Sequence, residues 1–297
     1  MSKKMNPLLK HSIALTLSTA VFSSTSYAAT CSLASGNNWT STSWSGCAAS
    51  GPVTGDNVYL DRSSTSLNGL VTPVLNTLTF SVNNTLNDAG ASTGHLSMLT
   101  FANFIGLNII DFTTNNSLLT IQNSGISTRN DFSSTFKFGT GTVKLGGDLL
   151  IHADSRAPVN VHGKFTMNSG GTLEFTAAST SIKAYRNGTN IAVITLQGTS
   201  STPLVLKSAG TTTFIAPAAT GATGAGTYNL DYVHFATGTW VVDPSVTITE
   251  PPNCTAAAGA TPPAAWTGCT ASSAVSASVN LNNNKKPELF SRKILLE

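Results

Sequence analysis

Acidic, basic and imidazole side chains gather in the sequence between residues 148 and 164. The candidate catalytic residues are Asp148, His152, Asp154 and Arg156, and His162 and Lys164 follow them. Because residues two apart on a β-strand share a face, positions 152, 154 and 156 can present an imidazole, a carboxylate and a guanidinium together. Such groups transfer protons in general acid–base catalysis. The same alternation also fits a solvated face, where an Asp–Arg pair stabilises the fold by less than about 1 kcal/mol, so both interpretations stay open.

Other patterns of catalysis and metal binding are missing from the sequence. The histidines after residue 28 lack the H-x-x-x-H or Cys/His spacing of metal sites; they are His95, His152, His162 and His234. No helical segment is expected after residue 28, so the chain offers no strand-to-helix turn to hold a nucleophilic serine. The glycine-rich segment 219–226 lacks the lysine and the following helix of a phosphate loop. We therefore expect no metal ion and no cofactor.

The elements that position these side chains are short strands. Apolar and polar residues alternate over short runs that end in Gly, Asn, Ser or Thr, and no run has a helical period. In residues 168–208, large apolar and β-branched residues recur at a period of two, which is typical of strands with one buried face. These residues are Leu173, Phe175, Ile191, Val193, Thr195 and Val205.

An apolar–polar–apolar phrase followed by a polar turn recurs along the chain. It is found at residues 78–80, 99–101, 119–121, 143–145, 173–175 and 194–196, in steps of 21, 20, 24, 30 and 21 residues. A nearly constant period without helices predicts a solenoid of stacked β coils, in which each unit buries its apolar face on the next. An antiparallel β-sandwich also gives strands separated by turns at short intervals, and it is the alternative fold.

The most apolar region, residues 70–126, supplies the expected core. The core candidates there are Phe80, Leu99, Phe101, Phe104, Ile105, Ile109, Ile110, Phe112, Leu118 and Ile121.

The first 28 residues have the pattern of a secretory signal peptide. Lys3, Lys4 and Lys10 precede an apolar run at 13–22, and small residues follow up to Ala28. We expect cleavage after Ala28, and no later run is long enough for a transmembrane helix. The sequence therefore predicts a secreted or outer-surface protein, with the periplasm as an alternative.

The charge balance limits the partners. The whole chain has 16 basic and 13 acidic residues, but the three lysines of the signal leave 13 of each after residue 28. A neutral and sparsely charged surface argues against nucleic acid and anionic membranes, which need clustered Lys and Arg. The polar residues are mainly Ser, Thr, Asn and Gly. Host or environmental glycans, surface proteins and further copies of this chain are the partners that such a surface fits.

Four cysteines in an exported chain predict two disulfides. Cys31 and Cys47 are near the start of the mature chain, and Cys254 and Cys269 are near the end of the β-rich region, so we expect two local bridges among three connectivities. Trp44 and Trp266 each precede the second cysteine of a pair by three residues. We expect these tryptophans to pack on the disulfides and cover the ends of the solenoid; a sugar-stacking platform is the alternative.

Two phrases resemble a known group of proteins. Trp44-Ser45-Gly46, the run 51–61 (GPVTGDNVYLD) and a Leu-Thr-Phe strand resemble the start of repeats in large bacterial surface proteins. The segments 194–199, 203–208 and 228–233 are similar to later rungs of the same proteins. The resemblance implies a right-handed parallel β-helix of the pectin-lyase-like fold. It implies no single activity, because unrelated functions share this fold.

Enzymes of that fold place acidic Ca²⁺ ligands and a basic residue on one face and act on acidic polysaccharides. Residues 148–164 lack a strand with paired carboxylates and the Asn-Thr-Asp or Gly-His-Gly phrases of the fold's hydrolases. We therefore expect adhesion or extracellular structure, through a low-charge Ser/Thr/Asn-rich flank of the solenoid. A polysaccharide lyase or hydrolase is the second hypothesis, and the N-terminal remnant of a larger surface repeat protein is the third.

The predicted fold is all-β, a right-handed parallel β-helix with disulfide-closed ends. Its parts are a signal peptide (1–28), an N-terminal disulfide cap loop (29–50), the β-helix (51–250), a C-terminal disulfide loop (251–270), and a linker with a charged tail (271–297). The last thirteen residues, KKPELFSRKILLE, contain six charges, which separates them from the rest of the chain.

Overall fold

The protein is described by a computed structural model, and its described part is all-β. The described residues are 28–33, 39, 44–48, 51–60, 64–67, 70–80, 84–90, 92–104, 108–128, 134–153, 163–187, 189–215, 223–244, 246, 248 and 253–271. They form strands and turns and contain no helix. The predicted signal peptide up to residue 27 and the charged tail lie outside them. No helix among the described residues has the length and apolar character that crossing a membrane requires.

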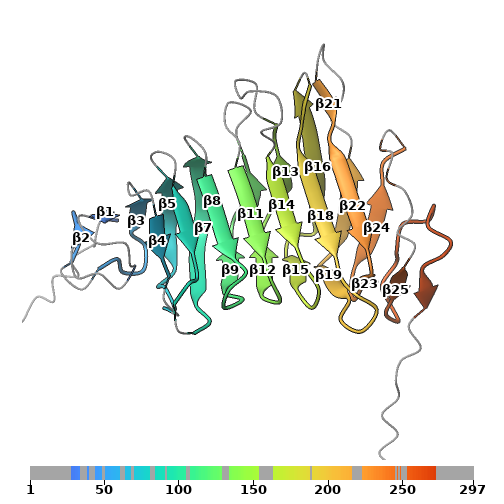
Figure 1. The fold of residues 1–297 in the computed structure, drawn as a ribbon, viewed down its shortest axis with the longest axis horizontal. Helices are drawn as coiled ribbons and strands as arrows, with labels where there is room; N and C mark the ends of the chain where they lie inside the picture. Colours follow the sequence, from blue (N-terminus) through green and yellow to red (C-terminus); the bar gives the residue numbers. More distant parts are fainter. Residues whose placement is uncertain are drawn as a thin grey trace, which may run out of the picture.

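The strands form three long sheets (Figure 1). Sheet A has twelve strands in the order β2 (Trp44–Ser45), β1 (Thr30–Leu33), β3 (Asn57–Leu60), β5 (Leu75–Phe80), β7 (His95–Phe104), β9 (Leu118–Ile121), β12 (Thr142–Leu145), β15 (Thr172–Phe175), β19 (Leu204–Ser208), β23 (Val233–Phe235), β25 (Cys254–Ala256) and β26 (Thr270–Ala271).

Sheets B and C have seven strands each. Sheet B has the order β22 (Thr227–Asp231), β18 (Val193–Gln197), β14 (Lys164–Met167), β11 (Ser134–Phe138), β8 (Asn108–Phe112), β6 (Thr85–Asn87) and β4 (Ser64–Ser66). Sheet C runs β10 (Ile126–Ser127), β13 (Leu149–Ile151), β16 (Ser179–Asn187), β20 (Thr211–Ile215) and β24 (Thr239–Val242), with β17 (Asn190–Ile191) and β21 (Thr223–Ala225) beside β16.

Most strand pairs are parallel, so the antiparallel sandwich is wrong. Among the described strands, only β1–β2, β16–β17 and β16–β21 pair antiparallel. From β9 to β23 the chain visits sheets A, C and B in turn before it returns to sheet A. The arrangement is consistent with a parallel β solenoid, as the repeated phrase predicts. The coils lengthen up to β19, since Val58 pairs with Leu78 but Leu173 pairs with Leu206. They shorten again after it, since Leu204 pairs with Val233 and Val233 with Cys254.

The core is a column of apolar side chains that point inward from all three sheets. Burial alternates along β8, β11, β12 and β15, as one-sided strands require. Phe112, Phe138 and Phe165 come from successive strands of sheet B, with ring centroids 5.9 and 5.6 Å apart. Aromatic pairs at this separation add to the stabilisation from apolar burial. The repeats are thereby joined into one continuous core.

Several expected positions differ in the structure. Phe80, Ile110, Phe112 and Ile121 are buried, but Leu99, Ile109 and Leu118 are at partly exposed positions, and Phe101 is only partly buried. The side chains of Phe104 and Ile105 are outside the described residues.

The face was also assigned wrongly between residues 191 and 205. Ile191, Val193, Thr195 and Val205 are partly exposed, whereas their neighbours Ala192, Ile194, Leu204 and Leu206 are buried. The phrase at 194–196 belongs to β18 of sheet B and not to sheet A with the other five. A one-residue offset in the alternation reverses the face.

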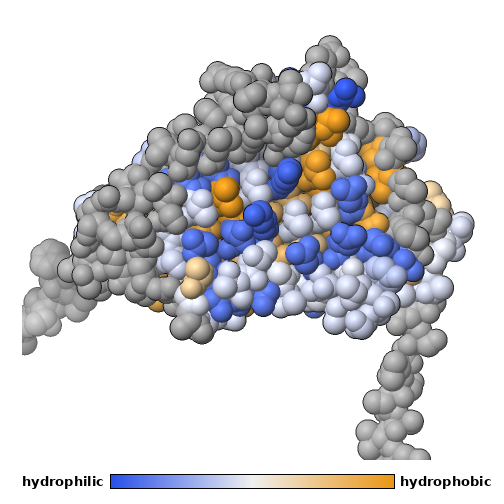
Figure 2. Space-filling view, in the orientation of Figure 1, coloured by the Kyte–Doolittle hydropathy of each residue, from blue (hydrophilic) through white to orange (hydrophobic). Residues whose placement is uncertain are grey.

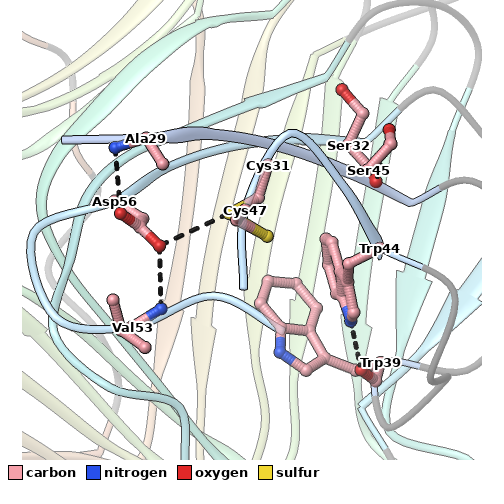
Figure 3. The surroundings of a disulfide bond; sticks show 9 residues. All are labelled: Ala29, Cys31, Ser32, Trp39, Trp44, Ser45, Cys47, Val53 and Asp56. Atoms are coloured by element: carbon pink, nitrogen blue, oxygen red, sulfur yellow. Dashed lines mark hydrogen bonds between the residues drawn. A yellow bond between two sulfur atoms is a disulfide. The ribbon is translucent and has the colours of Figure 1, made fainter. Parts of the chain in front are cut away.

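Disulfides lie near both ends of sheet A, and they join the cysteines as expected. Cys31 is bonded to Cys47 (Figure 3), and Cys254 is bonded to Cys269. Trp39 and Trp44 are buried with their rings 5.4 Å apart, and Trp266 is buried against Phe214 and Phe235. Buried rings cannot stack on a sugar. Trp44 and Trp266 therefore pack at the two ends of the core and do not form a sugar-binding platform.

Candidate binding face

A continuous row of polar side chains crosses the outer face of sheet B. Strand pairing places one residue of each of the seven strands in register, and all seven are at least partly exposed. This polar row is Ser66, Asn87, Asp111, Lys137, Thr166, Thr195 and Asn229. The row follows from the alternation of the strands, because the residues on either side of each member point into the core.

Members of the polar row contact one another and residues beside the row. Lys137 Nζ lies 3.2 Å from Asp111 Oδ2, and Thr113 Oγ1 donates to Asp111 Oδ1 at 2.6 Å. Asn229 Nδ2 donates to Thr195 Oγ1 at 3.4 Å. Burial alone would raise the pKa of Asp111, but the hydrogen bonds from Thr113 and Lys137 and the lysine charge hold that pKa below its usual value. Asp111 and Lys137 therefore neutralise each other, and the row has no net charge.

The spacing of the polar row suits a ligand with a repeating unit. Neighbouring strands lie about 4.8 Å apart, so hydroxyl, amide and charged groups recur at that interval along the solenoid. Figure 1 shows β8, β11, β14, β18 and β22 side by side. In the same view, Figure 2 shows a mainly hydrophilic surface on which hydrophobic residues form separate spots. A face of this kind can hydrogen-bond a long polar chain at many points.

The predicted acid–base cluster is divided between two sheets. Asp148 and His152 flank β13 of sheet C, whereas Lys164 begins β14 of sheet B. Lys164 therefore does not share a sheet with Asp148 and His152, because the chain crosses from one sheet to the other. Asp154, Arg156 and His162 lie outside the described residues. The strand itself ends at Ile151, before His152.

The two described members of this cluster have structural partners. Asp148 Oδ1 accepts a hydrogen bond from the backbone N–H of Ser181 at 2.7 Å. The His152 ring stacks on Tyr185 with centroids 3.9 Å apart and 12° between the planes. The backbone N–H of His152 donates to Thr128 Oγ1 at 2.7 Å. These contacts join neighbouring strands of sheet C.

The other described histidines lie on sheet A. His95 Nε2 is 2.9 Å from Thr120 Oγ1, and His234 Nδ1 is 2.8 Å from Thr255 Oγ1. Burial lowers the pKa of both rings. Among the described residues, the only His/Cys/Asp/Glu group close enough to share a metal ion is Cys31, Cys47 and Asp56. Both sulfurs of that group are bonded to each other, so it does not have the thiolate donors of a metal site.

Sequence reasoning missed a groove beside the C-terminal disulfide. Its volume is about 300 Å³, and its lining includes Thr199, Ser200, Tyr232, Asn253 and Thr255. Tyr232 has a positive φ of 45°, which is unusual for a bulky residue. In the sequence, Tyr232 belongs only to the segment 228–233, which resembles a β-helix repeat, and no local motif predicts a groove. The lining combines one aromatic ring with neutral polar groups, as in many sites for small polar ligands.

Comparison of the chain with protein-family models, with curated proteins and with solved structures finds no match.

Proposed function

We propose that this chain is an exported bacterial surface or secreted protein, built as a right-handed parallel β-helix, that binds neutral glycans through the outer face of sheet B. The observation that carries the proposal is the polar row, a register of seven polar side chains on seven adjacent strands. Hydroxyl and amide groups at a regular spacing match the hydroxyl groups of a polysaccharide. The balanced Asp111–Lys137 pair favours a neutral polymer over a charged one.

Export is supported by the cysteines and by the first 28 residues. Disulfides persist in oxidising compartments and are rare in the cytosol, and all four cysteines are bonded in two bridges. The basic residues, apolar run and small residues of positions 1–28 have the order of a signal peptide. Together these features favour a location outside the cytoplasm.

Binding on a flat face differs from binding in a pocket. Each partly exposed hydrogen bond contributes little, because water competes for the same groups. Affinity then comes from many contacts along one chain, in the manner of multivalent binding. We therefore expect long polysaccharides to bind much more tightly than their short fragments.

The test is a panel of neutral and acidic polysaccharides with the secreted protein. We expect binding to one or more neutral glycans, and loss of that binding in the triple variant Thr166→Ala, Thr195→Ala, Asn229→Ala. The matched control is Thr79→Ala, Thr142→Ala, Thr172→Ala, at partly exposed positions of sheet A. Equal loss in both variants would contradict the assignment to sheet B. Release of reducing or unsaturated ends would instead support the lyase or hydrolase hypothesis.

A further inference from the structure

Asp56 is a buried carboxylate at the N-terminal cap. It is 4% exposed and lies directly before β3. Its Oδ1 accepts a hydrogen bond from the backbone nitrogen of Ala29 at 3.0 Å, and its Oδ2 accepts one from the backbone nitrogen of Val53 at 2.9 Å (Figure 3). Cys31 Sγ is 3.4 Å from Oδ2, but a disulfide sulfur has no proton to donate.

A buried carboxylate is costly unless charge or several hydrogen bonds compensate it. The cap segment offers no side chain for this purpose. Between Ala29 and Leu60 the sequence contains no Lys or Arg, and Asp56 is the only charged residue. The two described donors to the carboxylate are neutral backbone amides. Within this segment, only a backbone amine can therefore supply a positive charge to Asp56.

The predicted signal cleavage supplies that cation at the required atom. Hydrolysis of the Ala28–Ala29 peptide bond by a signal peptidase consumes one water molecule. It leaves a carboxylate on Ala28, and the nitrogen of Ala29 takes up protons to become an α-ammonium group. The nitrogen that receives the charge is the same atom that lies 3.0 Å from Asp56 Oδ1.

We propose that Asp56 is the receptor for the new N-terminus, so that processing at Ala29 locks the N-terminal cap through an ammonium–carboxylate pair. A charge-assisted hydrogen bond is roughly twice as strong as a neutral one. This inference goes beyond glycan binding and involves no residue of the polar row.

The backbone around Ala29 is already ordered for this contact. Its carbonyl oxygen accepts a hydrogen bond from the backbone nitrogen of Asn57 at 2.7 Å, and β1 begins at the next residue and pairs with β3. Ala28 is exposed and Ala29 is half-buried, so the scissile bond lies where the chain leaves the cap. The ammonium group is therefore held in place with little additional loss of conformational freedom.

The experiment compares the chain that begins at Ala29 with a chain that retains Ala28, each with Asp56 and with Asp56→Asn. Retaining Ala28 moves the charge to an exposed residue about 3.8 Å further along the chain. With Asp56 present, we expect the chain that begins at Ala29 to melt about 2–4 °C higher. With Asp56→Asn, we expect this difference to disappear. The four proteins form a double-mutant cycle, which isolates the interaction between the α-ammonium group and Asp56. The same difference in both backgrounds would overturn the proposal.

A second measurement does not depend on the Asp56→Asn variant folding. At neutral pH, an amine-acylating ester should modify the α-amine of Ala29 about tenfold more slowly than the α-amine of the chain that retains Ala28, the factor that about 1.4 kcal/mol of preferential stabilisation produces. Equal rates would contradict the ion pair. Mass analysis of the secreted protein should show a chain that begins at Ala29, and a different start would remove the premise.

Discussion

The His152 ring lies flat on the Tyr185 ring, with 3.9 Å between their centroids, across the β13–β16 pair of sheet C. The contact continues the parallel register of these strands by one residue, since Ile151 pairs with Ala184. The Nδ1 atom of His152 is buried and has no hydrogen-bond partner among the described atoms. Burial lowers the pKa of His152, although a hydrogen bond between its imidazole and the Thr128 backbone opposes this effect, and burial raises the pKa of Tyr185.

The first prediction concerns the pH dependence of stability. Since the folded-state pKa of His152 lies below the unfolded value of about 6.5, the unfolded chain binds more protons in the window between them. The free energy of unfolding should therefore fall as the pH falls from about 6.5 toward the folded-state pKa. We expect His152→Gln to make this part of the profile flatter in urea unfolding experiments. An unchanged slope would show that His95 and His234, whose pKa values are also lowered, account for the pH dependence of stability.

The second prediction tests the two faces of β15. Leu173 is fully buried between Val143 and Leu206, whereas its neighbour Thr172 is partly exposed. We expect Leu173→Asp to reduce the free energy of unfolding by more than about 3 kcal/mol, because it removes core packing and buries a charge. Thr172→Asp should change it by no more than about 0.5 kcal/mol. Denaturant unfolding measures both, and similar losses would contradict the assignment of the faces.

The third prediction concerns the C-terminal disulfide. The Cys254–Cys269 bridge closes a loop with a sequence separation of 15, and a loop of that length stabilises a protein by about 3 kcal/mol through the entropy of the unfolded chain. We expect the double variant Cys254→Ser, Cys269→Ser to lose about that much. Hydrogen exchange should show the first loss of protection in β25 and β26, which end sheet A. Protection lost first in β3 or β5 would contradict an effect at this end.

The fourth prediction separates binding from catalysis. If residues 148–156 were catalytic, a single alanine at His152, Asp154 or Arg156 would abolish polysaccharide cleavage in folded protein. We expect no cleavage by the unmodified protein, and glycan binding within about twofold of its original strength in each single variant, because none of the three residues belongs to the polar row. Assays of reducing and unsaturated ends, together with a binding isotherm, check both parts. Cleavage that one such alanine removes would establish the enzyme hypothesis.

The strands and the disulfides could be predicted locally. Alternation along 143–145 and 173–175 follows from one-sided burial, and the structure shows the buried Val143, Leu145, Leu173 and Phe175 that this requires. The short separations of Cys31 from Cys47 and of Cys254 from Cys269 favoured local bridges. The faces of Ile109, Leu118 and Val193 could not be predicted, because apolar residues occupy adjacent positions there and either one could turn inward.

The amino-acid sequence by itself determined short one-sided strands, a stacking period and local disulfides, because each depends on residues near one another in the chain. Only the tertiary structure decided which strands share a sheet. It brought Asp111, Lys137 and Thr166 from separate coils into one polar row, placed Lys164 on a different sheet from Asp148, and set Ala29 against Asp56. These contacts depend on how many residues each coil contains. Coil length varies from turn to turn, so no local pattern encodes it.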